Sequence, residues 1–456
     1  MPELTSFGIL ADDLTGACDC GVQFSARGAR VRVLTIHDPA PPYPAPPYPG
    51  PLDNRGDWDV TVLNTESRHC DPQEASRRVA DGVVCLARVG WPVRYLKIDS
   101  TLRGNPVAEV APLLGEPGAT VLVAPAFPPA GRTVEGGTLL VNGIPVHETE
   151  IGRDRLTPVL ESHLPTLFAD GLREPVGQIA LPEIAAGAAE LAERLAAHRR
   201  DGRRVVVADA RSDGDLDVLA AALMQAWEGT SGPIVVVGSA GMARAMAARM
   251  IPDARPAPTP PEIGAAGGER GPVLIVAGSR QEVTRRQVDY VGSRRDAFHY
   301  PVDPAPCDDA AWARRERVWL AEGVETLERA AAGGASLLQV SIALDDAGGE
   351  DPARFQARSA RLNRALGSLV VELAARLRLA GLVLTGGDIA LAALGALEAQ
   401  ALELGGEVLA GLPLSWTVGG RRPGLPVVTK AGGFGAADAL WVAARVIAEG
   451  RGVAAE

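Results

Sequence analysis

The sequence predicts an α/β protein with two domains, each a mostly parallel sheet with flanking helices. Short apolar runs recur along the chain and alternate with amphipathic stretches rich in alanine, leucine and arginine, as expected when crossover helices join parallel strands. A length of 456 residues exceeds one ordinary core and, at about 150 residues per domain, suggests two large domains or three small ones. We expect two.

The first series of expected strands ends before residue 250. Each is a short apolar run bounded by turn-forming or polar residues. The runs are residues 6–10, 30–35, 60–64, 93–98, 120–124, 204–208 and 233–237. The proline-rich residues 38–51 separate the second strand from the third, and we expect an ordered surface loop there.

A second series of strands is expected at residues 273–277, 336–341, 381–384 and 425–429. Residues 251–271 lie between the two series, are rich in proline, alanine and glycine, and show no apolar periodicity. We therefore predict a first domain at residues 1–250, a linker at 251–271 and a second domain at 272–456.

Composition argues against several classes of protein. A formal net charge of −11 leaves no basic face to neutralise a nucleic-acid backbone. The five cysteines are odd in number and form no CxxC motif, which argues against a disulfide framework and a structural zinc site. Residues 1–10 lack the features of a signal peptide, and no run approaches the roughly 18 apolar residues of a membrane span. We expect a cytoplasmic protein that binds neither nucleic acid nor membrane.

Lysine is rare in this chain, which contains only Lys97 and Lys430 among 45 basic residues. A compact ammonium group meets a single oxygen as a point charge, whereas a guanidinium group demands a planar, bidentate partner. Each lysine follows an apolar run and opens a glycine-containing loop. We interpret each as the exit of a buried strand into a functional loop, and the alternative is two surface lysines retained by chance.

Two adjacent carboxylates, Asp12 and Asp13, follow the first strand and precede Thr15 and Gly16, where a helix should begin. Ligands of open parallel sheets bind beyond the carboxyl ends of the strands. Because adjacent side chains point in opposite directions, one aspartate could accept a substrate proton or hydroxyl while the other caps the helix or binds a cation. The roles of the two aspartates stay open at this point.

The exits of the third and fourth strands bring three cations, Arg68, Lys97 and Arg103, to the same edge of the sheet. Asp99 and Ser100 add polar groups there. An arginine holds a carboxylate in a fork, and sugar hydroxyls pair with aspartate and serine. The arrangement suits a small hydroxylated carboxylate, with ordinary surface salt bridges as the alternative.

Two further segments carry chemistry-bearing residues. A turn at 124–133 presents Arg132, and the sequence around Asn142 and Gly143 predicts a β-hairpin. His147 is a candidate general base or, alternatively, a hydrogen-bonded structural histidine.

Three glycine-bearing turns follow strands of the second domain, at residues 277–280, 385–389 and 430–435. Glycine lets the backbone approach a phosphate, and a following helix directs free N–H groups toward anionic oxygens. The chain has no GxxxxGK[ST] motif and no GxGxxG after a first strand, so neither a P-loop nor a dinucleotide fingerprint is present. Together the turns indicate a nucleotide site. Each turn taken alone could instead be an ordinary connection between a strand and the following helix.

Four motifs, read in order, resemble the four-carbon acid sugar kinase family. They are Ala11-Asp-Asp-Leu-Thr-Gly-Ala, Lys97-Ile-Asp-Ser-Thr-Leu-Arg-Gly-Asn, Thr385-Gly-Gly-Asp and Lys430-Ala-Gly-Gly-Phe-Gly. The resemblance covers nearly the whole chain. It implies phosphorylation of an acid such as threonate, erythronate or a 3-oxo form with ATP, an acid-binding first domain, a nucleotide-binding second domain, and an active site in the cleft between them.

The resemblance also implies site residues. Acid-binding positions carried over by motif are Asp12, Arg68, Lys97, Ile98, Asp99 and Ser100, to which our own interpretation adds Asp13 and Arg103. ATP-binding positions are Ser279, Gly386, Gly387, Asp388, Ile389 and Gly432. The chain departs from the family where Gly278-Ser-Arg-Gln replaces Gly-Ser-x-Ser and Lys430-Ala-Gly replaces Lys-Ser-Gly, but backbone N–H groups can make such phosphate contacts.

We expect a catalytic group made of Asp12, Lys97, Asp99 and Lys430. Asp12 is the first choice and Asp99 the second for accepting the proton of the terminal hydroxyl. Magnesium would bridge the β- and γ-phosphates of ATP, and one or both lysines would offset charge on the transferred group. Its ligands in the protein are unknown from sequence.

Two alternatives belong to other classes. One is a non-catalytic protein that binds nucleotide and acid to regulate a partner, and the other is a nicotinamide-dependent dehydrogenase, which the missing fingerprint disfavours. A homo-oligomer is possible, although no coiled-coil heptad is present.

Overall fold

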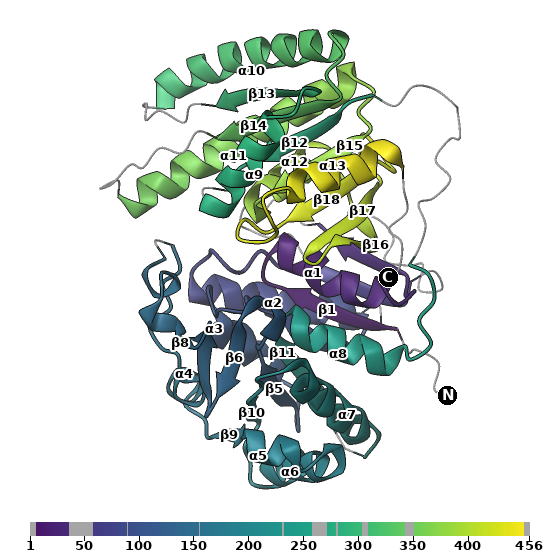
Figure 1. Cartoon of the computed structure of the whole chain (residues 1–456). Coiled ribbons are helices and arrows are strands. Elements are labelled where there is room, and N and C mark those ends of the chain that lie inside the picture. Colours follow the sequence, from purple (N-terminus) through teal and green to yellow (C-terminus); the bar gives the residue numbers. More distant parts are fainter. Residues whose placement is uncertain are drawn as a thin grey trace. The chain divides into compact units, whose positions relative to one another are not determined.

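The computed structural model of the chain describes residues 6–35, 58–88, 90–154, 156–229, 232–257, 271–279, 281–302, 309–342 and 351–450. The chain forms two compact units, Met1–Arg32 with Pro51–Pro256 and Val33–Gly50 with Ala257–Glu456 (Figure 1). Most of the predicted linker, the proline-rich residues 38–51 and Arg280 lie outside the described residues.

The sheet of the first unit has the strand order β3, β1, β4, β11, β5, β10, β9, and β2, of which Val31 and Arg32 belong to this unit, lies beside β3. Its pairs from β3 to β9 are parallel. The bounds are β1 Phe7–Ala11, β2 Val31–Leu34, β3 Val60–Asn64, β4 Val93–Lys97, β5 Thr120–Ala124, β9 Val176–Ile179, β10 Val205–Ala208 and β11 Ile234–Gly238. Strands β1, β3, β5, β10 and β11 are buried throughout, which explains their continuous apolar runs.

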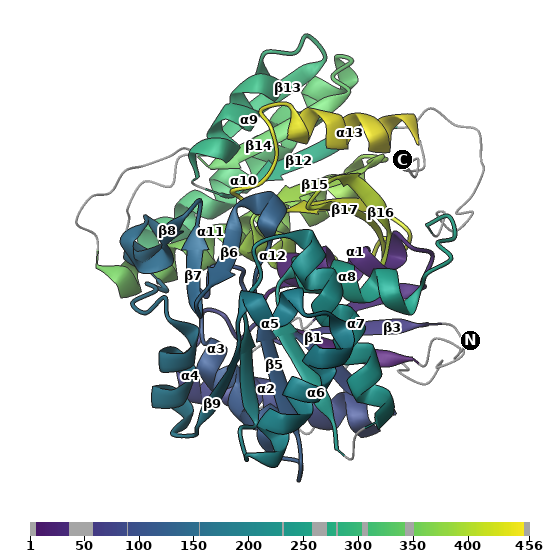
Figure 2. The same ribbon diagram turned by 60° about the horizontal axis from the view of Figure 1, so that its bottom comes forward.

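Helices pack around this sheet in two layers (Figure 2). One layer contains α1 (Leu14–Ser25), α8 (Ala240–Met250), α7 (Asp213–Gly229) and α6 (Ala188–Arg200), which contact one another in that order. The other contains α2 (Pro72–Arg88), α3 (Pro106–Val110) and α4 (Leu164–Leu172), and α5 (Leu181–Ala185) contacts α6 and α7. Right-handed crossovers place α1 and α2 on opposite faces of the sheet.

A small antiparallel sheet stands apart from the main one and consists of β6 (Arg132–Glu135), β7 (Thr138–Val141) and β8 (Ile144–Pro145). The turn between β7 and β8 is Asn142-Gly143, with φ of 50° and 80°. These positive angles are those of a two-residue hairpin turn, so the predicted hairpin is confirmed.

The sheet of the second unit has the order β13, β14, β12, β15, β18, β17, β16. It is parallel from β13 to β18, and β17 pairs antiparallel with both neighbours. Its strands are β12 Val273–Ala277, β13 Ala297–Val302, β14 Leu337–Ile342, β15 Gly381–Thr385, β16 Ala401–Leu409, β17 Leu412–Val418 and β18 Pro426–Lys430. Helices α9 (Glu282–Gly292) and α13 (Ala439–Glu449) contact each other, while α10 (Asp309–Ala332), α11 (Pro352–Arg376) and α12 (Gly387–Ala396) form a second layer.

The α/β class with mostly parallel sheets is confirmed, and every predicted strand is present to within one or two residues at each end. The sequence interpretation missed β9, β13, the β16–β17 hairpin and strand β6 of the small sheet. In the part of the chain that the structure describes, no helix is long and apolar enough to cross a membrane.

Candidate active site

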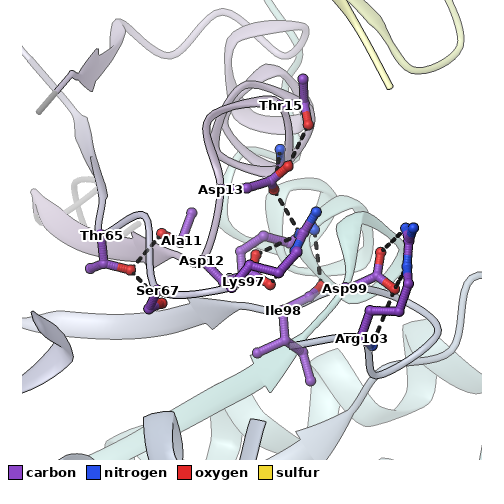
Figure 3. A network of polar contacts seen from close by, with 12 residues as sticks. Ala11, Asp12, Asp13, Thr15, Thr65, Ser67, Lys97, Ile98, Asp99 and Arg103 are labelled. Atoms are coloured by element: carbon purple, nitrogen blue, oxygen red, sulfur yellow. Dashed lines mark hydrogen bonds and ion pairs between the residues drawn. The ribbon is translucent and has the colours of Figure 1, made fainter. Parts of the chain in front are cut away.

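The end of β1 and the start of α1 are joined by Asp12 and Asp13. Asp13 has an extended backbone and is the N-cap of α1, where its Oδ1 accepts a hydrogen bond of 2.8 Å from the backbone N of Gly16. Its Oδ2 accepts one of 2.5 Å from Thr15 Oγ1 (Figure 3). The capping role considered for one of the two aspartates therefore falls to Asp13.

Arg68, which follows β3, joins the two aspartates. Its Nε donates to Asp12 Oδ2 at 2.8 Å, and its Nη2 donates to Asp12 Oδ1 and to Asp13 Oδ1, both at 2.7 Å. We expected the two aspartates to point in opposite directions, and this is wrong because both carboxylates reach one guanidinium group. Strand alternation no longer applies once the chain leaves β1 at Ala11.

Lys97, at the end of β4, is 4% exposed and donates from Nζ to the carbonyl oxygen of Ile98 at 2.9 Å. The helix start lies close to it. A Cβ atom on Gly16 would lie 2.9 Å from Lys97 Nζ and 2.4 Å from Asp13 Oδ1. A side chain at this position would displace the Asp13 carboxylate or the Lys97 ammonium group, so Gly16 allows both groups to approach the start of α1.

Asp99 and Arg103 form a second ion pair in the loop after β4 (Figure 3). Arg103 donates from Nε and Nη2 to the two carboxylate oxygens of Asp99, both at 3.0 Å. Thr101 donates to Asp99 Oδ2 from its hydroxyl and its backbone N. Ser100 is half-buried beside this pair.

The two candidate bases, Asp12 and Asp99, differ in electrostatic environment. Burial raises the pKa of Asp12, and the charge of Arg68 offsets this only in part. Burial also acts to raise the pKa of Asp99, but the Arg103 and Arg68 charges and the hydrogen bonds outweigh it and hold that pKa well below its usual range. For Asp13, the charges of Arg68 and Lys97 likewise outweigh burial and lower the pKa. Asp12 is therefore the better proton acceptor of the set.

The sequence interpretation missed Glu109, which lies on α3 and is 1% exposed. Burial, and then the nearby charge of Asp12, raises its pKa to about 8, while a hydrogen bond with the Ser67 side chain opposes the shift. Among the described residues its Oε1 has no hydrogen-bond partner. In the sequence, Glu109 follows shortly after Asn105-Pro106 and has the position of an ordinary acidic residue in the first turn of a helix. No local signal therefore marks it as buried.

The other chemistry-bearing segments lie as follows. Burial lowers the pKa of the Arg132 guanidinium, and the charges of Asp99 and Arg103 also act on it, so Arg132 lies near that ion pair. His147 is exposed, and its Nδ1 is 2.7 Å from Ser162 Oγ.

The second unit brings the three predicted glycine turns together. The backbone N of Gly278 donates to Thr385 O at 3.1 Å, and that of Gly386 donates to Lys430 O at 2.9 Å. A Cβ atom on Gly432 would lie 2.0 Å from Ser279 Oγ, so these two residues touch directly. The third turn therefore packs against both of the others.

The remaining ATP-binding candidates begin α12. Gly386 is its N-cap with φ of 105°, Gly387 opens the helix, and Asp388 stands in the first turn. A Cβ atom on Gly278 would lie 1.9 Å from Ile389 Cγ1, so Ile389 closes the contact between the first two turns.

Lys430 is fully buried, and its ammonium group faces its own loop. Nζ donates to the carbonyl oxygens of Ala431, Gly432 and Phe434 at 2.8, 3.1 and 3.0 Å. Burial lowers its pKa to about 8. All three donors of the ammonium group are used by the backbone, and the role expected of Lys430 at the phosphates stays a prediction.

Potential metal ligands are few. Across the described ranges, no group of three or more His, Cys, Asp or Glu side chains is placed to hold a metal ion. Asp388 is an acidic residue within the predicted nucleotide turns, in the first turn of α12.

Comparisons with known proteins match two family models to the chain, one to each series of strands. Residues 7–246 match the family model of a sugar-binding N-terminal domain, and residues 274–440 match that of a nucleotide-binding C-terminal domain. A D-threonate kinase of Salmonella typhimurium is 34% identical over 95% of this chain and 96% of its own length. A D-erythronate kinase of Heliobacterium modesticaldum is 30% identical over 94% of each chain.

A solved structure of a Haemophilus influenzae protein superposes with a TM-score of 0.70 at 20% identity, covering 97% of this chain and 100% of that chain. This likeness shows the fold. The two family models and the full-length relatives confirm the resemblance found in the sequence: the chain belongs to the four-carbon acid sugar kinase family, a family of ATP-dependent phosphotransferases.

Proposed function

We propose that this protein transfers the γ-phosphoryl group of ATP to the terminal hydroxyl of a four-carbon sugar acid and forms the 4-phosphate. The observation that carries the proposal is the buried group of Asp12, Asp13, Arg68 and Lys97 at the exits of three adjacent parallel strands. It lies within the residues that match the sugar-binding model.

Asp12 accepts the proton of the attacking hydroxyl in this proposal. A base is most effective when its pKa approaches the working pH, and burial moves the pKa of Asp12 in that direction. Arg68 contacts both of its carboxylate oxygens and fixes their orientation. Each oxygen still has a lone pair with which to accept the hydroxyl proton.

Lys97 offsets negative charge on the transferred group. Among the described residues its Nζ has one hydrogen bond, to Ile98 O, and an ammonium group has three donors, so two remain for other acceptors. Asp99, Ser100 and Arg103 lie next to it along the chain and bind the hydroxyl groups and carboxylate of the acid.

The nucleotide is proposed to bind at the glycine turns of the second unit, through Ser279, the Gly386–Ile389 turn and Gly432. The sugar-acid domain is then residues 1–250 and the nucleotide domain residues 272–456, joined by the linker at 251–271. Because phosphoryl transfer requires the two ligands to meet, the reaction needs both domains.

Magnesium belongs to the proposal as the ion that accompanies ATP. When bound, it neutralises charge on the β- and γ-phosphates. Such an ion takes most of its ligands from phosphate and water, so it needs few protein carboxylates.

D-threonate is the first acid to test, because the D-threonate kinase relative is more similar to this chain than the D-erythronate kinase relative, at 34% against 30% identity. The experiment is coupled ADP release with ATP and magnesium across threonates, erythronates, their 3-oxo forms and larger sugar acids. Turnover with one four-carbon acid supports the proposal and names the substrate. ATP binding without turnover on any acid would contradict it and favour the regulatory alternative.

A further inference from the structure

The loop that follows β18, residues 431–436, is tied down by buried side chains. Besides the three bonds from Lys430, the two N–H groups of Gln287 Nε2 are shared among the carbonyl oxygens of Phe434, Gly435 and Ala436, which lie 3.0, 3.1 and 2.8 Å from that nitrogen. Thr284 Oγ1 donates to Gly432 O at 2.9 Å. Every carbonyl oxygen of the 431–436 loop except that of Gly433 therefore has a side-chain donor.

The donors lie inside the protein and the loop lies at its surface. Lys430 and Gln287 are 0% exposed and Thr284 is 1% exposed, whereas Gly433, Gly435 and Ala436 are exposed. Thr284 and Gln287 are three residues apart on α9 and so share one face of that helix. The carbonyl groups are consequently drawn inward, toward α9 and Lys430.

Inward carbonyl groups fix the direction of the amide groups. In a planar trans peptide, the C=O of one residue and the N–H of the next point to opposite sides. The bonded carbonyls of 431, 432, 434 and 435 therefore turn the N–H groups of Gly432, Gly433, Gly435 and Ala436 outward. Within the described ranges, none of these four amides donates a backbone hydrogen bond.

Several outward amides on a glycine-rich loop form a concave anion site. We infer that Lys430, Gln287 and Thr284 are positioning residues for ATP, which hold the 431–436 loop so that its amides face the phosphates. In this arrangement Lys430 acts on the nucleotide through the loop and does not touch it. The inference rests on the proposed function and adds Gln287 and Thr284 to the residues on which ATP binding depends.

The test separates phosphate recognition from folding. Calorimetry measures the affinities of wild type, Gln287→Leu, Lys430→Met and Thr284→Val for ATP and for adenosine, which has no phosphate. Gln356→Leu, an exposed position on α11, is the matched control.

We expect Gln287→Leu and Lys430→Met to weaken ATP binding about tenfold or more and to leave adenosine binding within about twofold. Thr284→Val removes one hydrogen bond and should weaken ATP binding by a smaller factor. Equal weakening of ATP and adenosine would show a structural role only and would overturn the inference. Unchanged ATP affinity in all three variants would also overturn it.

Thermal unfolding of each variant accompanies the binding data. If Gln287→Leu does not fold, the affinities of Thr284→Val for ATP and adenosine test the inference instead. Loss of one buried hydroxyl is the mildest of the three changes. A wild-type protein that turns over sugar acid with ATP, together with ATP affinity that the variants leave intact, refutes only the inference. A wild-type protein that binds no ATP refutes the proposed function itself.

Discussion

The two polar regions of this protein are built from different kinds of chemical group. At the exits of β1, β3 and β4, charged side chains pair with one another, as in Asp12 with Arg68 and Asp99 with Arg103. In the second unit, the turns after β12, β15 and β18 contact one another through backbone atoms, and the 431–436 loop is held by an ammonium, an amide and a hydroxyl group. The first construction can discriminate among hydroxyl groups of a small acid, and the second suits the repeated oxygens of a phosphate chain.

The two lysines show the same contrast. Lys97 lies next to carboxylates, and Lys430 donates to three backbone carbonyls. Identical residue types at similar strand exits therefore serve different physical purposes, and substitutions can separate them.

Asp12→Asn should have the largest effect. The amide keeps the shape of the side chain but cannot accept a proton, so kcat should fall about 10²- to 10⁴-fold with ATP affinity unchanged. Asp99→Asn should lower kcat less, because the pKa of Asp99 is held well below its usual range. Steady-state kinetics measure both, with exposed Asp217→Asn as control. A larger loss for Asp99→Asn would reverse the choice of base.

Lys97→Met and Lys430→Met test most directly whether the two lysines have different roles. Lys97→Met should lower kcat about 10²- to 10³-fold, as expected when a group that stabilises transition-state charge is removed. Lys430→Met should act mainly on the KM for ATP. Circular dichroism verifies the fold of each variant, and near-normal turnover of Lys97→Met would remove it from the catalytic group.

A pair of glycine substitutions tests whether the acid and ATP bind to different units. Gly16→Ala places a Cβ atom 2.4 Å from Asp13 Oδ1, and Gly432→Ala places one 2.0 Å from Ser279 Oγ. Each overpacking costs about 1–3 kcal/mol, so we expect roughly tenfold to hundredfold increases in KM. Gly16→Ala should raise the KM for the acid and Gly432→Ala that for ATP, while Gly214→Ala, at an exposed site, should change neither. A raised KM for ATP in Gly16→Ala, or a raised KM for the acid in Gly432→Ala, would contradict the assignment of the acid to the first unit and of ATP to the second.

Glu109→Gln should give the smallest effect, on stability. Burial raises the pKa of Glu109 from the ordinary 4.5 to about 8, so the folded protein keeps a proton that the unfolded chain releases. Stability from this proton is complete below pH 4.5 and is lost as the pH rises toward 8. Glutamine is neutral throughout, so the Tm of Glu109→Gln should exceed that of wild type at pH 8 by several degrees and converge with it toward pH 5.

Thermal unfolding at several pH values measures this difference, and exposed Glu116→Gln is the control. A Tm difference independent of pH would show that Glu109 is ionised in the folded protein.

The interior strands and their exits could be predicted because buried parallel strands leave continuous apolar runs. The strands that were missed lack this signal. β9 and β13 occupy the ends of their sheets, β9 contains Gly177, and β13 contains Pro301, a residue that edge strands tolerate. β16 contains Gly405, where a Cβ atom would lie 2.6 Å from Trp416, so a glycine needed for packing was not readable as part of a strand.

The sequence placed Asp12, Arg68 and Lys97 at one sheet edge, because strand exits follow from local patterns and the carboxyl ends of parallel strands share one edge of a sheet. It could not pair them, since Arg68 and Asp12 are 56 residues apart and their contact depends on the tertiary fold. The inward direction of Lys430 and the burial of Glu109 and Gln287 are also tertiary properties. No spacing or composition marks them.

The hydrogen bonds that hold the 431–436 loop determine when the conformational entropy of ordering this loop is lost. Fixing a free backbone costs about 1–2 kcal/mol per residue in conformational entropy, and a loop ordered only by its ligand would subtract that from the binding free energy. Here the protein's own side chains hold five carbonyl oxygens of the loop. The ordering is therefore completed during folding, and under the inference above ATP affinity depends on the stability of the second unit.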